Sequence, residues 1–239
     1  MNQVSKQLGV AYGTVYNYAQ KQKGPSNASG ALVQQLYGSC LTMSMDTLAP
    51  LLRSLPLTHQ AVFAALTCEK MLPAIVRFDE AEASPGAPIF RNAIKTLCAF
   101  GTHEPVHRDQ FARLQQQLEA CWPDLDESTN PGAAYAFDAC VALGEALALV
   151  QDAEADHVVH CATAARDTVD MYVQDVTGID LPPAELNAFI DATPVMQREV
   201  ARQVATAHAL AGESHLTASF IDHLRQQSGQ QLLLDVAVL

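Results

Sequence analysis

Three carboxylates in an otherwise apolar stretch are the residues of this sequence best placed to do chemistry. Asp138, Glu145 and Asp152 are seven residues apart, so on a helix they share one face. Carboxylates in apolar surroundings can act as general acids or bases, because burial raises their pKa. They can equally form ion pairs, and Lys70 and Arg77 have the same spacing. Three interpretations stay open: a solvated helix edge, an ion-pair set joining two helices, or a catalytic carboxylate site.

Asp138 lies in an apolar stretch that runs from Ala133 to Val150. We predict that this stretch is the central buried helix and that Asp138 is largely buried in it. Because a buried charge is costly unless it is paired, Asp138 needs a partner. We expect it to contact the helix from Leu57 to Phe78, where Lys70 or a backbone donor would pair with it.

Two Glu-x-x-His pairs have the spacing of metal ligands on one face of a helix. They are Glu104 with His107 and Glu154 with His157. Glu104 stands beside a proline in an apparent loop. His157 and His160 are flanked by aspartates, which indicates a solvated helix start. We therefore interpret both pairs as surface features, and we predict no metal site and no cofactor.

Motifs of well-known enzyme and nucleotide-binding classes do not occur in the chain. It contains neither the G-x-S-x-G of serine hydrolases nor a strand to carry that motif. It also lacks the phosphate-binding G-x-x-x-x-G-K-[ST] and the dinucleotide-binding G-x-G-x-x-G. The six cysteines show no C-x-x-C spacing and mostly lie among apolar residues, which is typical of structural thiols. The sequence therefore predicts a protein that is not an enzyme.

The elements that must position these residues are helices. From Asp46 onward, apolar residues recur at helical spacing and no segment shows strand alternation. We predict an all-α fold, a helical bundle forming one multi-helix domain over 46–239. Within the first long helix, Thr58 is the expected N-cap, and Pro73 should kink or divide the helix. The expected helices are a short one capped by Asp46, then 57–78, 89–100, 108–121, 133–150, 156–174, a section that starts at Pro182 and Pro183, 195–211, 217–226 and 230–238.

Composition and charge describe a globular chain with a small basic arm. Of the 239 residues, 49% are hydrophobic and 17% are charged, which favours a large core over disorder. The net charge is -12, yet residues 1–42 contain three lysines and no acid. The acidic body repels nucleic acid and anionic membranes. With no signal-peptide pattern and no long uncharged apolar run, we predict a cytoplasmic protein without membrane contact.

Residues 1–23 fit the template of a helix-turn-helix. Ser5, Gly9 and Val15 supply the small residue, the turn glycine and the apolar residue that locks the second helix. We predict a helix-turn-helix-like extension at 1–23 and a linker at 24–45, which contains GPSNASG. Nucleic acid could be bound only through this extension. The candidate DNA-binding residues are Thr14, Tyr16, Asn17, Gln20 and Lys21.

The stretch LTHQAVFAALTCEKMLPAIVRF matches a bacterial family whose first helix reads H-Q, F-A-A, C-E-R-M, P-N-Y and Phe. The corresponding residues here are His59-Gln60, Phe63-Ala64-Ala65, Cys68-Glu69-Lys70-Met71, Pro73-Ala74-Ile75 and Phe78. The family pattern D-A-C-x-A-L occurs at 138–143, and its Pro-x-x-x-x-Glu occurs from Pro194 to Glu199. Residues 46–226 thus resemble the YjaG-like domain-of-unknown-function family 416.

The resemblance implies an all-α fold and, through genomic neighbourhood, an association with histidine kinases and signalling. It carries over no established catalytic residue. Six family-motif residues are candidates for a functional role. They are His59, Gln60, Glu69, Lys70, Asp138 and Glu199.

We therefore predict an uncharacterised bacterial helical protein that acts as a non-enzymatic signalling adaptor, with a protein partner or as a homodimer. One alternative is a DNA-associated transcriptional regulator that uses residues 1–23. The other is an enzyme with a carboxylate/His site. That enzyme would need Glu69, Asp138 and His59 to meet in one cavity.

The DNA alternative is tested by comparing the full chain with a variant that starts at Met43, in an anisotropy titration against duplex DNA. We expect the two proteins to bind equally weakly or not at all, because the body is acidic and two short helices contact few phosphates. Tighter binding by the full chain alone, falling steeply with salt, would contradict this expectation and support the regulator.

Overall fold

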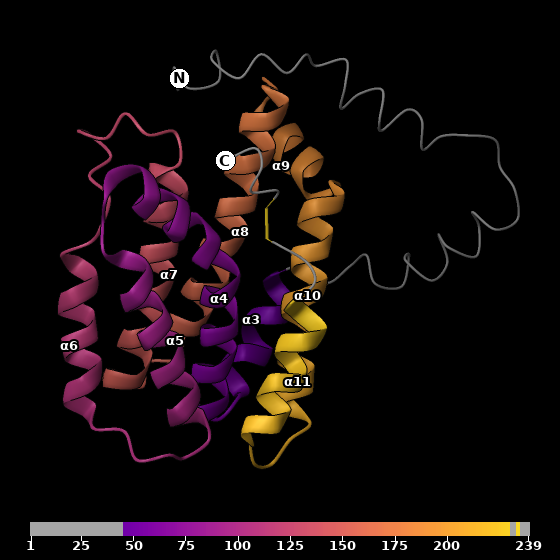
Figure 1. The fold of residues 1–239 in the computed structure, drawn as a ribbon. Coiled ribbons are helices and arrows are strands. Elements are labelled where there is room, and N and C mark those ends of the chain that lie inside the picture. The colour runs from indigo at the N-terminus through magenta and orange to yellow at the C-terminus, as the bar shows by residue number, and fades with distance from the viewer. Residues whose placement is uncertain (1–44, 230–232, 235–239) are drawn as a thin grey trace, which may run out of the picture.

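The computed structural model describes residues 45–229 and 233–234, and in this part of the chain the helical spacing of apolar residues produces nine helices and no strand (Figure 1). The all-α prediction is confirmed there. The helices are α3 (Met45–Ser54), α4 (Leu57–Glu82), α5 (Gly86–Gly101), α6 (Arg108–Glu119), α7 (Ala133–Asp152), α8 (Asp156–Thr177), α9 (Pro183–Asp191), α10 (Pro194–Ala211) and α11 (Ala218–Gly229).

The predicted extension at 1–23, its five candidate DNA-binding residues and all of the predicted linker except Met45 lie outside the described residues. The helix predicted over 230–238 can be examined only at Leu233 and Leu234. Both leucines are buried, but the chain bends at this point and is not helical. The prediction of a helix is therefore wrong for these two residues.

The central helix of the bundle is α7. It packs against α4, α5, α6 and α8, and most of its residues are buried. By length and composition alone α7 could cross a membrane. However, 67% of its most apolar 18-residue stretch is buried inside the protein. The prediction of a central buried helix is confirmed, and core packing accounts for its apolar surface.

Small side chains let α4 approach its neighbours closely. Ala61, Ala64 and Ala65 are fully buried, and α4 packs against α5, α7, α8 and α10. At the end of α5, a Cβ added to Gly101 would overlap the Val62 side chain of α4. This crossing therefore requires glycine, because the fully buried Val62 cannot be moved without disturbing the core.

Two predictions about α4 are wrong, namely that Pro73 divides it and that Thr58 caps it. The helix runs unbroken to Glu82, so Pro73 does not divide it. A proline inside a helix costs about 3 kcal/mol, whereas burying each apolar neighbour such as Met71 and Ile75 contributes roughly 1.5–3 kcal/mol, so burial outweighs the break. Thr58 is not the N-cap, because the helix already begins at Leu57 and Pro56 precedes it.

A turn of three residues joins α7 to α8 and sets the register of this pair. Ala153 adopts the left-handed conformation, with φ 64°, and ends α7. The Oδ1 atom of Asp152 accepts a hydrogen bond from the backbone N of Glu154 at 2.9 Å. So short a connection makes the two helices an antiparallel hairpin. The end of α7 therefore lies beside the start of α8.

Candidate functional site

The carboxylate face of α7 lies along the seam with α8. Asp138, Glu145 and Asp152 all form hydrogen bonds or ion pairs with side chains of α8. The seven-residue spacing had predicted a shared face, and the structure shows these contacts on one neighbouring helix. Of the three interpretations of this face, the geometry favours bonded pairs that join two helices. The second helix, however, is α8 and not α4.

Asp138 is half-buried, and its contact is different from the predicted one. The hydroxyl of Thr168 on α8 donates to its Oδ2 at 3.1 Å. The charges that act on Lys70 belong to Arg202, Glu199 and Glu69, so pairing of Asp138 with Lys70 is wrong. Burial raises the pKa of Asp138 to about 6, partly offset by the hydrogen bond from Thr168. The helix register decides this contact, because it turns the carboxylate face of α7 toward α8.

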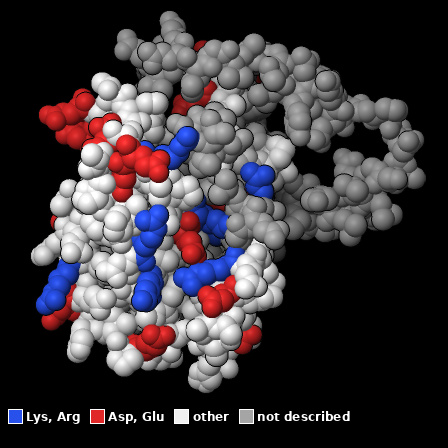
Figure 2. Space-filling view, in the orientation of Figure 1, with Lys and Arg blue, Asp and Glu red and all other residues white. Residues whose placement is uncertain are grey.

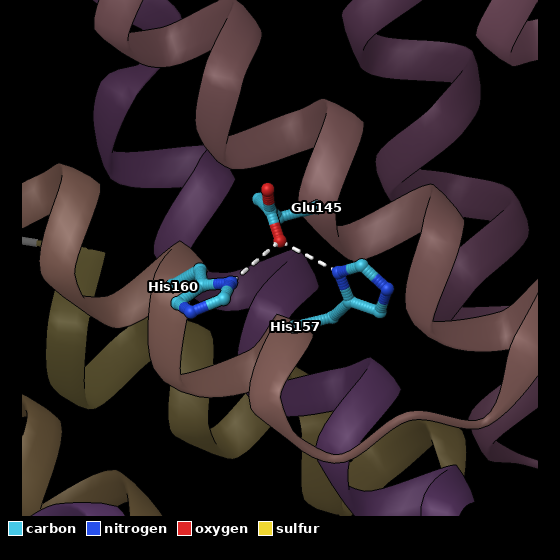
Figure 3. Close-up of side chains that lie close together, drawn as sticks. All are labelled: Glu145, His157 and His160. Atoms are coloured by element: carbon cyan, nitrogen blue, oxygen red, sulfur yellow. Dashed lines mark hydrogen bonds and ion pairs between the residues drawn. The ribbon is translucent and has the colours of Figure 1, made fainter.

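Glu145 lies two turns further along α7, toward the loop side of the seam, and meets two histidines. Its Oε2 atom is 2.6 Å from Nδ1 of His157 and 3.2 Å from Nδ1 of His160 (Figure 3). The two imidazole rings come from successive turns of α8 and are nearly perpendicular, with an interplanar angle of 86°. Among the described residues, these three side chains could hold a metal ion, since their ligand atoms lie within 4.8 Å of one another.

Asp152 contacts the ring nitrogen of His157 that points away from Glu145. Its Oδ2 atom is 3.0 Å from Nε2 of His157, so the ring lies between two carboxylates. Burial would lower the pKa of His157, but the hydrogen bonds to Glu145 and Asp152 and their negative charges outweigh it and raise the pKa. The arrangement fixes the ring orientation and stabilises positive charge between the two carboxylates.

Neither Glu-x-x-His pair singled out in the sequence forms this cluster as a pair, because His157 takes part in it without Glu154. Glu154 is exposed and contributes its backbone N to the turn. Glu104 is also exposed and accepts a hydrogen bond from Thr102, while His107 precedes α6. The signal that sequence reasoning missed is a carboxylate in the last two turns of one helix, facing histidines three residues apart across a short turn.

Among the family-motif residues, His59 and Gln60 are buried and bind backbone carbonyls. Nε2 of Gln60 donates to the carbonyl oxygen of Leu52 at 3.0 Å, near the end of α3. Nε2 of His59 is 3.0 Å from the carbonyl oxygen of Glu213, which follows α10. Through these hydrogen bonds, both side chains attach the start of α4 to α3 and to the segment after α10.

Glu69 forms an ion pair with Arg225 of α11, with 3.0 Å between Oε2 and Nε. Arg225 also donates to the sulfur of Cys98 on α5 at 3.4 Å. Lys70, the next family-motif residue, is half-buried, and its pKa is lowered by burial and by the charge of Arg202. Figure 2 shows Lys and Arg side chains over α4, α5 and α11, with Asp and Glu side chains among them.

Glu199 of α10 forms a buried ion pair with Arg202. Two hydrogen bonds join them, Nε to Oε2 at 2.7 Å and Nη2 to Oε1 at 2.5 Å, and their side chains are 3% and 10% exposed. Gln203 donates to the same Oε1 at 2.7 Å and to the carbonyl oxygen of Ala162 on α8 at 3.0 Å. Burial would lower the pKa of Arg202, but the charge of Glu199 and the hydrogen bonds raise it.

Two buried thiols lie beside this ion pair. Sγ of Cys68 on α4 is 4.0 Å from Sγ of Cys161 on α8. The hydrogen bond to Cys161 and burial raise the pKa of Cys68, so this thiol stays protonated at neutral pH. The prediction that the cysteines are structural agrees with the burial of both side chains.

The enzyme alternative requires Glu69, Asp138 and His59 to meet in one cavity. In the structure these three side chains contact different segments. Glu69 contacts α11, Asp138 contacts α8, and His59 contacts the segment after α10. The structure instead groups Glu145 with His157 and His160.

We expect Asp138 to make stability depend on pH. Its folded-state pKa of about 6 exceeds the value of about 3.9 in an unfolded chain, so the folded protein holds the proton more tightly. This contribution is complete below about pH 4 and is lost as pH rises through about 6. The free energy of unfolding of Asp138→Asn, relative to that of wild type, should therefore rise by about 1–2 kcal/mol between pH 4 and pH 7. This value includes a reduction because Asp138 is partly exposed to solvent.

Urea unfolding at several pH values measures this difference. Glu119→Gln, which removes an exposed carboxylate of α6, is the matched control for loss of charge. If the free energies of unfolding of wild type and Asp138→Asn change in parallel with pH, the carboxyl group titrates alike in the folded and unfolded protein, which would contradict the prediction.

Comparison with known proteins agrees with the fold. The model of a family described as a protein of unknown function, DUF416, matches residues 48–233. The crystal structure of a DUF416 family protein from Shewanella baltica OS155 is similar, with a TM-score of 0.68 and 23% identity over 76% of this chain and 93% of that one. No curated protein matches the chain. The family match spans well over half of the sequence, and the chain therefore belongs to the DUF416 family of proteins of unknown function.

Proposed function

We propose that this chain is a non-enzymatic helical protein that acts by binding an acidic protein partner, as an adaptor in signalling would. The proposal rests on the observation that the family-motif residues form contacts within the protein. His59, Gln60 and Glu69 join α4 to three other segments, and Glu199 neutralises a buried arginine. These polar groups serve contacts between helices, which supports a role in building a surface more than a role in turnover.

The surface that would bind the partner is the basic face over α4, α5 and α11 (Figure 2). Arg91 and Lys95 lie four residues apart on α5, so they share one side of that helix, and both are exposed. Arg77 of α4, the helix packed against α5, is also exposed. Exposed cations on a chain of net charge -12 favour an acidic partner by charge complementarity.

The structural role of Glu199 predicts the sign of a stability change. Glu199→Gln leaves the buried charge of Arg202 uncompensated, so we expect the free energy of unfolding to fall by about 3 kcal/mol. Replacing both Glu199 and Arg202 by Met should recover most of this loss, because no buried charge remains. Urea unfolding monitored by circular dichroism gives both values.

A residue kept for catalysis commonly costs stability, so its removal stabilises the protein. A Glu199→Gln variant that is as stable as wild type, or more stable, would therefore contradict the structural role and favour the enzyme alternative. The same comparison applies to Glu69→Gln, where we expect a smaller loss because its ion pair with Arg225 is partly exposed.

Partner binding is tested by charge reversal. We expect Arg91→Glu with Lys95→Glu to weaken the interaction about tenfold or more, because like charges would then face each other. Cross-linking in cells followed by mass spectrometry would measure the loss of a specific acidic protein. The matched control reverses Arg108 and Arg113, which are exposed on α6. Equal recovery of the same proteins by both double variants would contradict the proposed surface.

A further inference from the structure

The side chains at the loop end of the α7–α8 seam have the composition of a transition-metal site. Two imidazoles and one carboxylate, from His157, His160 and Glu145, converge on one point (Figure 3). Imidazole nitrogen suits Zn²⁺ and other late first-row metals, whereas Mg²⁺ and Ca²⁺ prefer oxygen ligands throughout. The donor set therefore selects a transition-metal ion over the hard divalent ions.

Two of the three distances between ligand atoms fit a zinc ion with little movement, and the third is within 4.8 Å. Zinc bonds to imidazole nitrogen and carboxylate oxygen are about 2.0–2.2 Å long, so tetrahedral ligands lie about 3.3 Å apart. Oε2 of Glu145 is already 3.2 Å from Nδ1 of His160, and it is 2.6 Å from Nδ1 of His157. Opening the shorter distance by under about 1 Å is within reach of side-chain rotation.

The surroundings of His157 match those of a metal ligand. Its second ring nitrogen, Nε2, lies 3.0 Å from Oδ2 of Asp152. A proton on Nε2, donated to this carboxylate, leaves the lone pair of Nδ1 directed at the point shared with Glu145. A carboxylate behind a ligating histidine is the usual device that fixes its tautomer and raises its basicity. The rigid three-residue turn holds both residues in place.

The burial pattern gives an ion access to the cluster. The side chains of His157 and Glu145 are 24% and 27% exposed, while that of His160 is 61% exposed. The inner two ligands are thus held by packing, and the third lies on the rim where solvent reaches it. Three protein ligands leave a tetrahedral ion with one further position, which water or a group from another molecule can fill.

We propose that Glu145, His157 and His160 bind a divalent transition-metal ion, with Zn²⁺ the ion that the donor set and spacing fit best. Asp152 acts as a positioning residue through His157. A bound ion would join the end of α7 to the start of α8 and present an open coordination position at the surface. The site is independent of the basic face over α4, α5 and α11.

The experiment measures metal binding to the folded full-length chain under reducing conditions. Melting temperatures are not used as the measure of binding, because metals also bind cysteine and histidine in the unfolded chain. Co²⁺ absorption in the visible reports coordination by nitrogen and oxygen at low coordination number, and competition with a chelating dye gives the Zn²⁺ affinity. The variants are Glu145→Gln, His160→Ala and Asp152→Asn. The control is His107→Ala, an exposed histidine that also follows a glutamate by three residues.

We expect one ion per wild-type chain. Asp152→Asn should weaken Zn²⁺ binding about 10–100-fold, as loss of a carboxylate behind a ligand does, and the two ligand variants should weaken it more. His107→Ala should bind as wild type does, and circular dichroism should show all four variants folded. Affinity that is the same in wild type and the ligand variants, or a Co²⁺ spectrum no different from that of the free ion, would overturn the proposal.

Discussion

Close packing of α4, α7 and α8 through small side chains is the constraint on which the other features depend. Ala64, Ala139 and Ala162, one from each helix, are fully buried. Backbones that approach this closely leave little room for water, so a polar group between them is costly unless it finds a partner within the protein. Gln203 therefore donates to the carbonyl of Ala162, and the hydroxyl of Thr168 donates to Asp138.

The polar groups differ in burial with their distance from this packed centre, so that some are enclosed and others are reached by solvent. The ion pair of Glu199 and Arg202 is almost fully enclosed, and its two strong hydrogen bonds make it a fixed part of the interior. Along the α7–α8 seam, exposure rises from the half-buried Asp138 to the rim residue His160. The open end of the seam combines side chains held by packing with access for a ligand, and the proposed metal site lies there.

Much of the fold could be predicted from the sequence because helix formation is encoded locally. Apolar spacing located the helices that begin at Leu57, Arg108 and Ala133. The apolar residues Phe111, Leu114 and Leu118 of α6 recur at helical spacing and form its buried face. The failure at Pro73 occurred where tertiary burial opposed a local rule. Pro73 lies inside α4 because the apolar residues on both sides of it are buried in the core, and burial outweighs the broken helical hydrogen bond.

The sequence by itself determined the helices, the family and the shared face of Asp138, Glu145 and Asp152, since each follows from residues close together in the chain. Only the tertiary structure decided which groups that face would meet. Thr168 is 30 residues from Asp138, and Glu69 is 156 residues from Arg225. Periodicity defines a face but not the helix that covers it, because the partner depends on how whole helices pack and on the turn between them.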